Sequence, residues 1–312
     1  MKKLSALLLA GMMTFTAQLK AADYDLDSAG PENFQQFNPE FAEKQTGPFT
    51  VSIKGDWFAK AKLRHHHRGN LRYAHAEANA VATVWYNECN QEGLQFGVGY
   101  EYSKLDWHSN PFFRKKNYHT FTASTTYFTQ RLCDWKWVAS LNYNIDAEKW
   151  NFNKYSTWDI LLWGRYSYSD CFGIHTGIYA ETGMKMDRVW PVLGFDLQIT
   201  ERIKLNAVYP LNMSLVYTVN ENWNVAGVVR TFSDRHRAGD KGFYRKAVWR
   251  YSNMGTEGAI NYVTDSGRIN ANAHAGYALG GRVRIANMHN HHSRNRRLRG
   301  CFYAGGSLSY NF

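Results

Sequence analysis

The stretch Cys301-Phe-Tyr-Ala-Gly-Gly-Ser-Leu-Ser-Tyr-Asn-Phe312 decides the fold of this chain. Its side chains alternate between an apolar or small row, which ends on Phe312, and a polar or small row. A period of two over about a dozen residues indicates a β-strand with one apolar and one hydrated face. The same pattern can be followed back along the chain.

About 14 segments of this kind, the C-terminal one included, fill residues 48–312, and several alternate for 12 residues or more. Strands of soluble proteins usually run about 5–6 residues. The segments are residues 49–63, 74–86, 94–103, 117–131, 135–145, 158–168, 174–181, 191–199, 202–209, 213–219, 223–232, 245–264, 268–285 and 301–312. Merging the short segments in the middle of the chain leaves 12 strands as the alternative.

The N-terminus carries the pattern of a secretory signal. Met1-Lys2-Lys3 is a short positive segment, Leu4 to Thr16 is apolar, and small residues at Ala21 and Ala22 suit a cleavage site. No later segment is apolar over the roughly 20 residues that a membrane-spanning helix needs. We therefore expect a signal peptide over residues 1–22, a periplasmic N-terminal arm over residues 23–47, and one β domain over residues 48–312.

An exported chain of long alternating strands predicts an all-β fold, namely a single transmembrane antiparallel up-and-down β-barrel of about 14 strands. Aromatic residues make up 16% of the chain, which is typical of barrels with Trp and Tyr at both membrane interfaces. An even number of strands brings both ends of the barrel to the periplasmic side. Closure also removes the exposed edges that an open sheet of this size would have.

The signal, the alternating segments and the final aromatic residue resemble those of single-chain bacterial outer-membrane β-barrels. The resemblance implies that Tyr310 and Phe312 belong to the signal read by the barrel-assembly machinery. Pro191 to Pro210 together with Leu215 to Gly227 resembles, more specifically, an uncharacterised barrel family of chlamydia-like and planctomycete-type Gram-negative bacteria. That resemblance implies the fold and an outer-membrane location, and brings no activity with it.

The connections between strands are predicted to differ between the two rims. With the first strand starting in the periplasm, the outer connections are long and basic and the inner ones short and neutral or acidic, so the formal charge of +11 lies largely on the outer rim. Such a rim can bind lipopolysaccharide phosphates, bind a sulfated host glycan, or steer anions to a pore; nucleic acid is excluded by the location. The basic loop residues are Arg64, His65, His66, His67, Arg68, Arg72, Arg114, Lys115, Lys116, Arg235, Arg237, Arg294, Arg296, Arg297 and Arg299.

Alternation also predicts which charged residues line the interior. Ten are Lys or Arg and six are Asp or Glu, an excess of cations that predicts a weakly anion-selective lumen. The predicted lumen residues are Lys54, Asp56, Lys60, Lys62, His75, Glu77, Glu101, Lys136, Asp159, Arg165, His175, Glu181, Asp196, Lys204, Arg230, Arg268, His274, Arg282 and Arg284.

Histidines and cysteines raise other possibilities. The loop histidines, such as His65 to His67, have no fixed geometry and have arginine neighbours that repel cations, so no metal or other cofactor is predicted. His75, His175 and His274 lie on hydrated faces with Glu77, Glu181 and Ser307 as conceivable partners, but no catalytic motif joins them and no enzyme is predicted. Unpaired or locally paired thiols and intermolecular disulfides both remain open for the four cysteines, Cys89, Cys133, Cys171 and Cys301.

The sequence therefore predicts a passive, weakly anion-selective pore for small solutes. The alternative is a surface adhesin or structural envelope protein whose basic loops bind lipopolysaccharide or sulfated glycans. Small lumen residues would favour the pore, and large interlocked Arg/Glu pairs would favour a plugged barrel. The oligomeric state stays open.

Overall fold

A computed structural model describes residues 48–64, 69–108, 110–132, 134–147, 154–184, 187–210, 212–239, 246–287, 289, 291 and 293–312. The predicted signal peptide and N-terminal arm lie outside these residues, as do His65, His66, His67, Arg68 and Cys133. No helix within the described ranges is long and apolar enough to cross a membrane.

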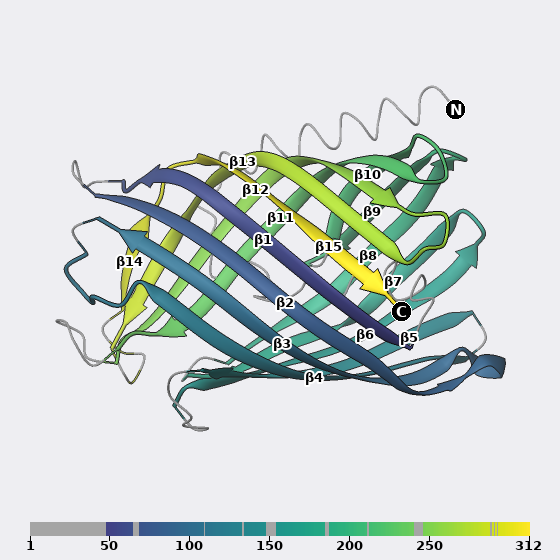
Figure 1. Ribbon diagram of the computed structural model, residues 1–312, viewed down its shortest axis with the longest axis horizontal. Helices are drawn as coiled ribbons and strands as arrows, with labels where there is room; N and C mark the ends of the chain where they lie inside the picture. The colour runs from purple at the N-terminus through teal and green to yellow at the C-terminus, as the bar shows by residue number, and fades with distance from the viewer. Residues whose placement is uncertain are drawn as a thin grey trace.

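One antiparallel sheet closes on itself into a barrel (Figure 1). Neighbours in sequence are neighbours in the sheet, and the first strand pairs with the last. The strands are β1 (Phe49–Lys62), β2 (Asn70–Asn87), β3 (Glu92–Trp107), β4 (Asn117–Leu132), β5 (Trp135–Asp146), β6 (Ser156–Ser169), β7 (Phe172–Gly183), β8 (Arg188–Thr200), β9 (Ile203–Tyr209), β10 (Asn212–Thr218), β11 (Trp223–Arg237), β12 (Val248–Val263), β13 (Ile269–Ala286), β14 (Arg294–Arg297) and β15 (Cys301–Asn311).

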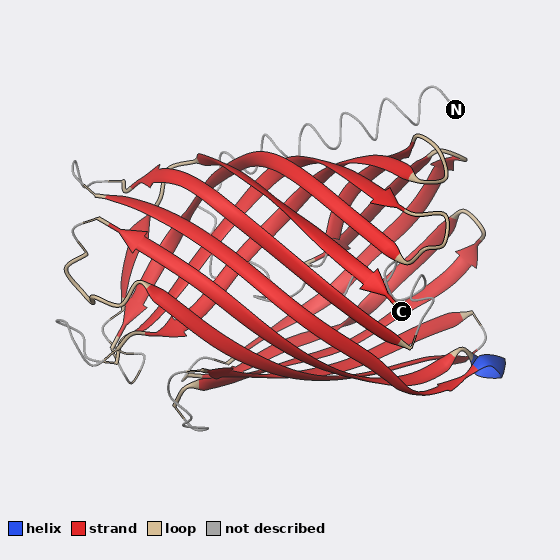
Figure 2. Ribbon diagram, in the orientation of Figure 1, coloured by secondary structure: helices blue, strands red, loops and turns tan. Residues whose placement is uncertain are grey.

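Short β14 and β15 occupy a single place in the barrel, because both pair with β13. Just after β14, Leu298 bridges to Leu63. The barrel thus has 14 strand positions, as predicted. The one described helix is the 3-10 turn η3 (Glu88–Asn90) between β2 and β3, drawn in blue in Figure 2.

The two ends of the barrel differ as the sequence predicts. At one end, here called the tight-turn end, strands are joined by short connections such as residues 201–202 and 219–222, and β15 finishes beside the start of β1. At the other, the long-loop end, connections such as residues 108–116 and 238–247 are longer. Exposed aromatic residues ring the tight-turn end, among them Tyr86, Tyr127, Tyr168, Trp223 and Phe312.

Phe312, the predicted terminal aromatic residue, lies at the seam where the last strand pairs with the first. The Phe312 N–H donates to the Phe49 carbonyl at 2.9 Å, and the two rings lie 5.4 Å apart. On either side of the seam the outer face of the barrel is apolar: Ile53 is 54% exposed and Trp57 is 55% exposed, whereas Asp56 between them is buried. An apolar outer face on a closed barrel suits the hydrocarbon of a bilayer.

Two irregularities reverse the alternation on which the lumen prediction rests. In β1 the register shifts between Phe58 and Ala61, and both residues line the interior core. Lys60 and Lys62 consequently turn to the outer face, where both are exposed. The prediction that they face the lumen is wrong, because a bulge adds a residue to one strand and moves the following side chains to the opposite face.

A second bulge lies in β13. Met254 pairs with Gly280 and Gly255 with Ala278, which leaves Leu279 as the extra residue, with Gly280 at a φ of 119°. Beyond it Val283 and Ile285 join the interior core. Arg282 and Arg284 therefore lie on the face opposite to that core, and the prediction that they share a face with His274 is wrong.

Candidate functional site: an occluded barrel interior

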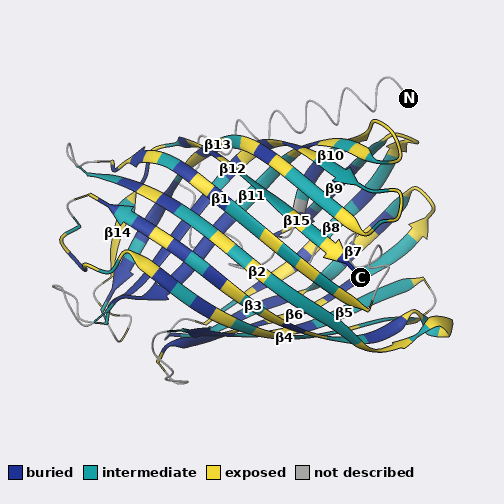
Figure 3. Cartoon of the chain, in the orientation of Figure 1, coloured by how far each residue is buried: buried dark blue, intermediate teal, exposed yellow. Residues whose placement is uncertain are grey.

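The burial pattern of β11 and β12 changes half-way along both strands. Near the tight-turn end their residues alternate between exposed and covered, as in any barrel wall. From Phe232 to Ala238 and from Ala247 to Asn253, every residue is buried. Strands buried on both faces have structure packed against both faces. We call these two segments the plug hairpin; the dark-blue area at the left of Figure 3 includes it.

Within the described residues, the plug hairpin lacks a strand partner on its β11 side, because β9 and β10 are short; on its other side β12 stays paired with β13 as far as Val248 and Ala286. Strand β8 pairs with β9 only as far as Leu193 and Tyr209. Strand β10 pairs with β11 only as far as Met213 and Val229. Within the described residues, strand pairing therefore joins β8 to β11 through β9 and β10 only over the tight-turn half.

Side-chain chemistry gives a reason for the inward turn. The outer face of β11 continues from Val225 and Val229 into Ser233, Arg235 and Arg237. An arginine on the lipid face of a barrel costs about 2–4 kcal/mol at the bilayer midplane. When the hairpin turns inward, these polar side chains meet polar groups of the protein instead of lipid.

One face of the plug hairpin packs against strands β1 to β4 through aromatic rings. Phe232 meets Phe58 of β1 edge to face, with ring centroids 4.7 Å apart, and Tyr251 stacks on Tyr73 of β2 at 4.3 Å. Trp249, fully buried, meets Tyr118 of β4 at 4.8 Å. These residues belong to one apolar cluster inside the barrel. It fills the interior between β1–β4 and the hairpin.

The opposite face packs against β7 and the residues just before β6 (Ser156–Ser169). Arg235 donates to the Gly183 carbonyl at 3.2 Å, and Arg237 donates to the Lys154 carbonyl at 2.6 Å. Arg250 lies 3.9 Å from the buried carboxylate of Glu181. The hairpin thus bridges two walls of the barrel, and interlocked Arg/Glu pairs are the feature that favours a plugged interior.

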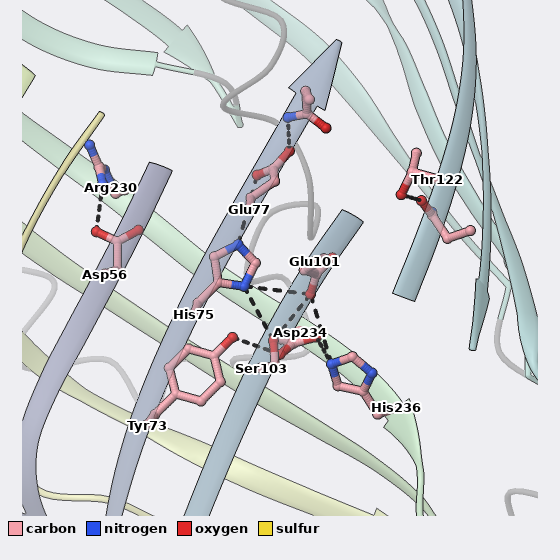
Figure 4. A network of polar contacts seen from close by, with 12 residues as sticks. Asp56, Tyr73, His75, Glu77, Glu101, Ser103, Thr122, Arg230, Asp234 and His236 are labelled. Atoms are coloured by element: carbon pink, nitrogen blue, oxygen red, sulfur yellow. Dashed lines mark hydrogen bonds and ion pairs between the residues drawn. The ribbon is translucent and has the colours of Figure 1, made fainter. Parts of the chain in front are cut away.

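A polar network joins the hairpin to β2 and β3 (Figure 4). The Tyr73 hydroxyl donates to Oδ2 of Asp234 at 2.6 Å, and Nε2 of His236 lies 2.6 Å from Oδ1 of the same carboxylate. Nδ1 of His75 lies 3.5 Å from Oε1 of Glu101. Since burying unpaired charges is costly, this arrangement holds the hairpin in one position.

A second network lies nearer the tight-turn end. Nε2 of His274 lies 2.7 Å from Oδ1 of Asp56, and Arg230 donates to that same oxygen at 3.3 Å. Arg230 also lies 2.7 Å from Glu257, which accepts a hydrogen bond from Tyr303 at 2.9 Å. Because Arg230 opens the segment that leads into the plug hairpin, this network ties the base of the hairpin to β1, β12 and β15.

A third network stays within one wall. Arg165 donates to both oxygens of Asp196, at 2.7 and 2.9 Å, and Nε2 of His175 lies 2.6 Å from the same carboxylate. The partners conceived for the three histidines are therefore different in the structure: His75 has Glu77 and Glu101, His175 has Asp196, and His274 has Asp56. His75 also has the Ser103 hydroxyl 3.2 Å from its Nδ1.

Strand register and contacts place several other predicted lumen residues. Lys54 pairs in register with Glu77, Lys136 with Arg165, and Lys204 with Gln198. Asp159 accepts a hydrogen bond from Asn144 at 2.7 Å. Arg268 is exposed just before β13, at the tight-turn end.

Two predicted loop residues are corrected. Arg235 and Arg237 lie in β11 and are only 3% and 2% exposed. Sequence reasoning ended this strand at residue 232 because the alternation stops there. It also missed Asp234, His236, Arg250 and Glu257. The signal for them was the run of polar residues on both faces of 233–237, which suits neither lipid nor a plain barrel wall.

The remaining basic residues form the long-loop rim. Arg64, Arg114, Arg294, Arg297 and Arg299 are exposed. Arg72 lies inside β2, and Arg294, Arg296 and Arg297 lie inside β14, so these four are strand rather than loop residues. Lys115 and Lys116 form ion pairs with Asp146 and Asp106, at 3.5 and 2.6 Å.

The described thiols differ in accessibility. Cys89 and Cys171 are free and exposed in connections at the tight-turn end, where they can meet another molecule. Cys301 is free and buried in the interior core. Intermolecular cross-linking through the two exposed thiols stays a prediction, whereas burial makes Cys301 unsuited to it.

The chain is similar in sequence to uncharacterised chlamydial proteins. No family model matches the chain. It is similar to an uncharacterised protein of Chlamydia trachomatis serovar D, 23% identical over 258 residues, which cover 78% of this chain and 80% of that one. The chlamydial resemblance is confirmed. An uncharacterised protein of Chlamydia pneumoniae is 22% identical over 292 residues, 85% of this chain and 87% of that one.

Two solved structures align with most of this chain. An outer membrane channel from Pseudomonas putida F1 aligns with a TM-score of 0.47 and 9% identity, over 91% of this chain and 99% of that one. The Pseudomonas putida toluene transporter TodX aligns with a TM-score of 0.41 and 11% identity, over 91% and 95%. TM-scores below 0.5 carry no information about the solute of this barrel.

Proposed function

We propose that this protein is an outer-membrane pore for small solutes whose long-loop end is closed by the plug hairpin. Barrels of 14 strands lie between the filled 8-stranded barrels and the open 16-stranded porins. The observation that carries the proposal is the packing of the plug hairpin against both walls. The hairpin fills space that is open lumen in a barrel without such a hairpin. Opening is withdrawal of this hairpin.

Two features support movement of the hairpin rather than a permanent core. On its β11 side, β9 and β10 do not pair with its long-loop half, so no strand pairing has to break there. On its other side β12 pairs with β13 as far as Val248 and Ala286, so the long-loop half of β13 moves with the hairpin or these pairs break. The contacts of the hairpin with β7 and with Lys154 are arginine contacts, which water can replace.

Conductance of the refolded protein in planar bilayers tests the proposal. Replacing Arg250 and Glu181 together, as Arg250→Leu with Glu181→Leu, removes a contact between hairpin and wall without leaving a buried charge. We expect a higher open probability than in the wild type. Arg165→Leu with Asp196→Leu is the matched control, because that ion pair lies within one wall, and its open probability should stay at the wild-type value.

The surface adhesin or structural envelope protein is the second candidate, and the filled interior favours it. The same experiment separates the two. A heat-modifiable, folded barrel that conducts neither as the wild type nor as the Arg250/Glu181 variant contradicts the pore and supports the second candidate.

Weak anion selectivity is the finer part of the proposal. Without Lys60, Lys62, Arg282 and Arg284, six cationic residues of the predicted lumen set face six acidic ones. The cationic excess then comes from the plug hairpin, which carries Arg235, Arg237 and Arg250 against Asp234, and it is reduced by the interior Glu257 outside the hairpin. Reversal potentials in a KCl gradient should be anion-selective in the wild type and shift toward zero in Arg235→Gln with Arg237→Gln. An unchanged potential in that variant contradicts the assignment.

A further inference from the structure

Three possible metal ligands meet where the plug hairpin touches the wall. Among the described residues, His75 of β2, Glu101 of β3 and Asp234 of β11 each offer one ligand atom, and the three atoms lie within 4.8 Å of one another. Glu101 and Asp234 are buried and His75 is half-buried. The figure of the network shows the three side chains converging from separate strands (Figure 4).

The distances between their ligand atoms suit coordination of one shared cation better than hydrogen bonds between the side chains. Zinc binds imidazole nitrogen and carboxylate oxygen at about 2.0–2.2 Å in a tetrahedron, which separates its ligand atoms by roughly 3.3–3.5 Å. Nδ1 of His75 and Oε1 of Glu101 are 3.5 Å apart. That distance is too long for a good hydrogen bond, since N–H···O bonds prefer 2.7–3.2 Å. Ser103 lies between them, with Oγ 3.2 Å from Nδ1 of His75, and donates to Oε1 of Glu101 at 3.1 Å.

The surroundings resemble the outer shell of a metal site. Ligating carboxylates and histidines are usually oriented by further hydrogen bonds. Asp234 has two such partners, the Tyr73 hydroxyl and Nε2 of His236, each at 2.6 Å. His75 has Oε2 of Glu77 3.8 Å from its Nε2. His236 is itself held by stacking on Tyr118, with ring centroids 4.8 Å apart.

The charges of the surrounding residues also favour a bound cation. Three carboxylates, from Glu77, Glu101 and Asp234, gather around two imidazoles in the barrel interior. Lys54 pairs in register with Glu77 on the neighbouring strand β1. A divalent cation placed among these carboxylates offsets the negative charge that burial makes costly. One imidazole with two carboxylates is a donor set for borderline divalent metals such as Zn²⁺ or Mn²⁺.

We propose that His75, Glu101 and Asp234 bind one divalent transition-metal ion of the Zn²⁺ class, which fastens the plug hairpin to the wall. A solvent molecule takes the fourth position, and His236 and Tyr73 orient Asp234. Metal binding stands independently of the proposed function. Its effect on opening rests on that function.

Titration of the refolded full chain with Zn²⁺, and with Co²⁺ as a spectroscopic probe, tests the site. We expect one tetrahedral Co²⁺ per chain, seen in the visible d–d bands, and displacement by Zn²⁺. Asp234→Asn with Glu101→Gln should abolish those bands. His236→Gln should weaken binding about 10-fold and keep the stoichiometry, as changes at outer-shell partners do.

Two controls separate this site from other metal-binding groups. Asp196→Asn changes a buried carboxylate–histidine pair that lacks a third ligand, and it should leave binding unchanged. Replacing the loop histidines His65, His66, His67, His289, His291 and His292 by Asn should also leave the Co²⁺ bands unchanged. Loss of the bands in the loop variant, or bands that persist in Asp234→Asn with Glu101→Gln, would overturn the proposal. So would the absence of binding in the wild type, which leaves the cluster as a hydrogen-bonded network of histidines and carboxylates.

Conductance then tests the fastening. Zn²⁺ should lower the open probability of the wild type, a chelator should raise it at least several-fold, and Asp234→Asn should respond to neither. One bound metal with no change in a measurable conductance refutes the fastening and keeps the site. One bound metal in a barrel that never conducts keeps the site and contradicts the pore.

Discussion

The two halves of β11 and β12 are continuous strands in different environments. Toward the tight-turn end, exposed residues such as Val225 and Ile260 alternate with covered ones such as Ala226 and Ala259. Toward the long-loop end the alternation gives way to continuous burial, and both faces meet protein. A strand therefore serves as wall or as plug according to whether its outward-facing residues are apolar or polar.

The third network sharpens this contrast. Arg165, His175 and Asp196 use the same chemistry as the networks around the plug hairpin, yet all three lie on adjacent wall strands. Wall interactions hold the barrel together, whereas plug interactions hold one part of it inside another. Variants of the two kinds should therefore separate assembly and stability from opening.

Removing Phe312 should have the largest effect, because it breaks the closing seam of the wall. The variant loses the N–H bond to Phe49 and the aromatic contact beside it, together with the predicted assembly signal. We expect export to continue while heat-modifiable folding is lost. Normal heat modifiability on gel electrophoresis of cell envelopes would contradict the role given to the terminal residue.

Phe58→Ala should be the next largest. Phe58 is 1% exposed and contacts the rings of Phe232, Tyr251 and Tyr303. Truncating a buried Phe to Ala costs about 3–5 kcal/mol. The free energy of unfolding by urea in lipid vesicles should fall by that amount, and the open probability should rise. Ile178→Ala on the lipid face is the control, and an equal loss there would show that the cluster is not well packed.

Arg230→Ala compares plug with wall directly. Its guanidinium joins Asp56 and Glu257, and breaking a buried ion pair by removing one partner costs about 3–5 kcal/mol. Partial exposure of Arg230 brings our expectation to the lower end of that range, about 3 kcal/mol. Arg165→Ala should destabilise the barrel and leave its open probability at the wild-type value, whereas Arg230→Ala should change both stability and open probability. An identical open probability in the two variants would contradict the distinction between plug and wall networks.

The smallest effect is expected at the basic rim, where the proposed partner is lipopolysaccharide. Lys60, Arg72 and Lys116 surround a cavity of about 440 Å³ on the outer face of the long-loop end. Attraction to an anionic membrane surface is worth about 1 kcal/mol per Lys or Arg. Lys60→Gln with Arg72→Gln should weaken binding to lipopolysaccharide vesicles by about 2 kcal/mol at low salt, and Arg202→Gln at the tight-turn end should not. Equal loss in both variants would show unspecific attraction.

Most of the architecture could be predicted from patterns within single segments of the sequence. The alternation in residues 301–312 is a property of neighbouring side chains, so it can be read without knowing what the strand touches. The same is true of the long strands, their number, the short and long connections, and the interior positions of Asp56, Glu101, Arg230 and His274. Each of these depends on a period of two that a single segment displays by itself.

Tertiary structure alone decided which face is which beyond a bulge, and what the interior holds. One extra residue near Ala59 and one at Leu279 reversed the faces of Lys60, Lys62, Arg282 and Arg284. An inserted residue moves every following side chain to the opposite face, and the alternation of the sequence does not show where the insertion lies. The contacts of Asp234 with Tyr73, and of Arg250 with Glu181, join residues 161 and 69 positions apart. Such pairs join strands far apart in the sequence, and no period within one segment reports which distant side chain a residue meets in the closed barrel.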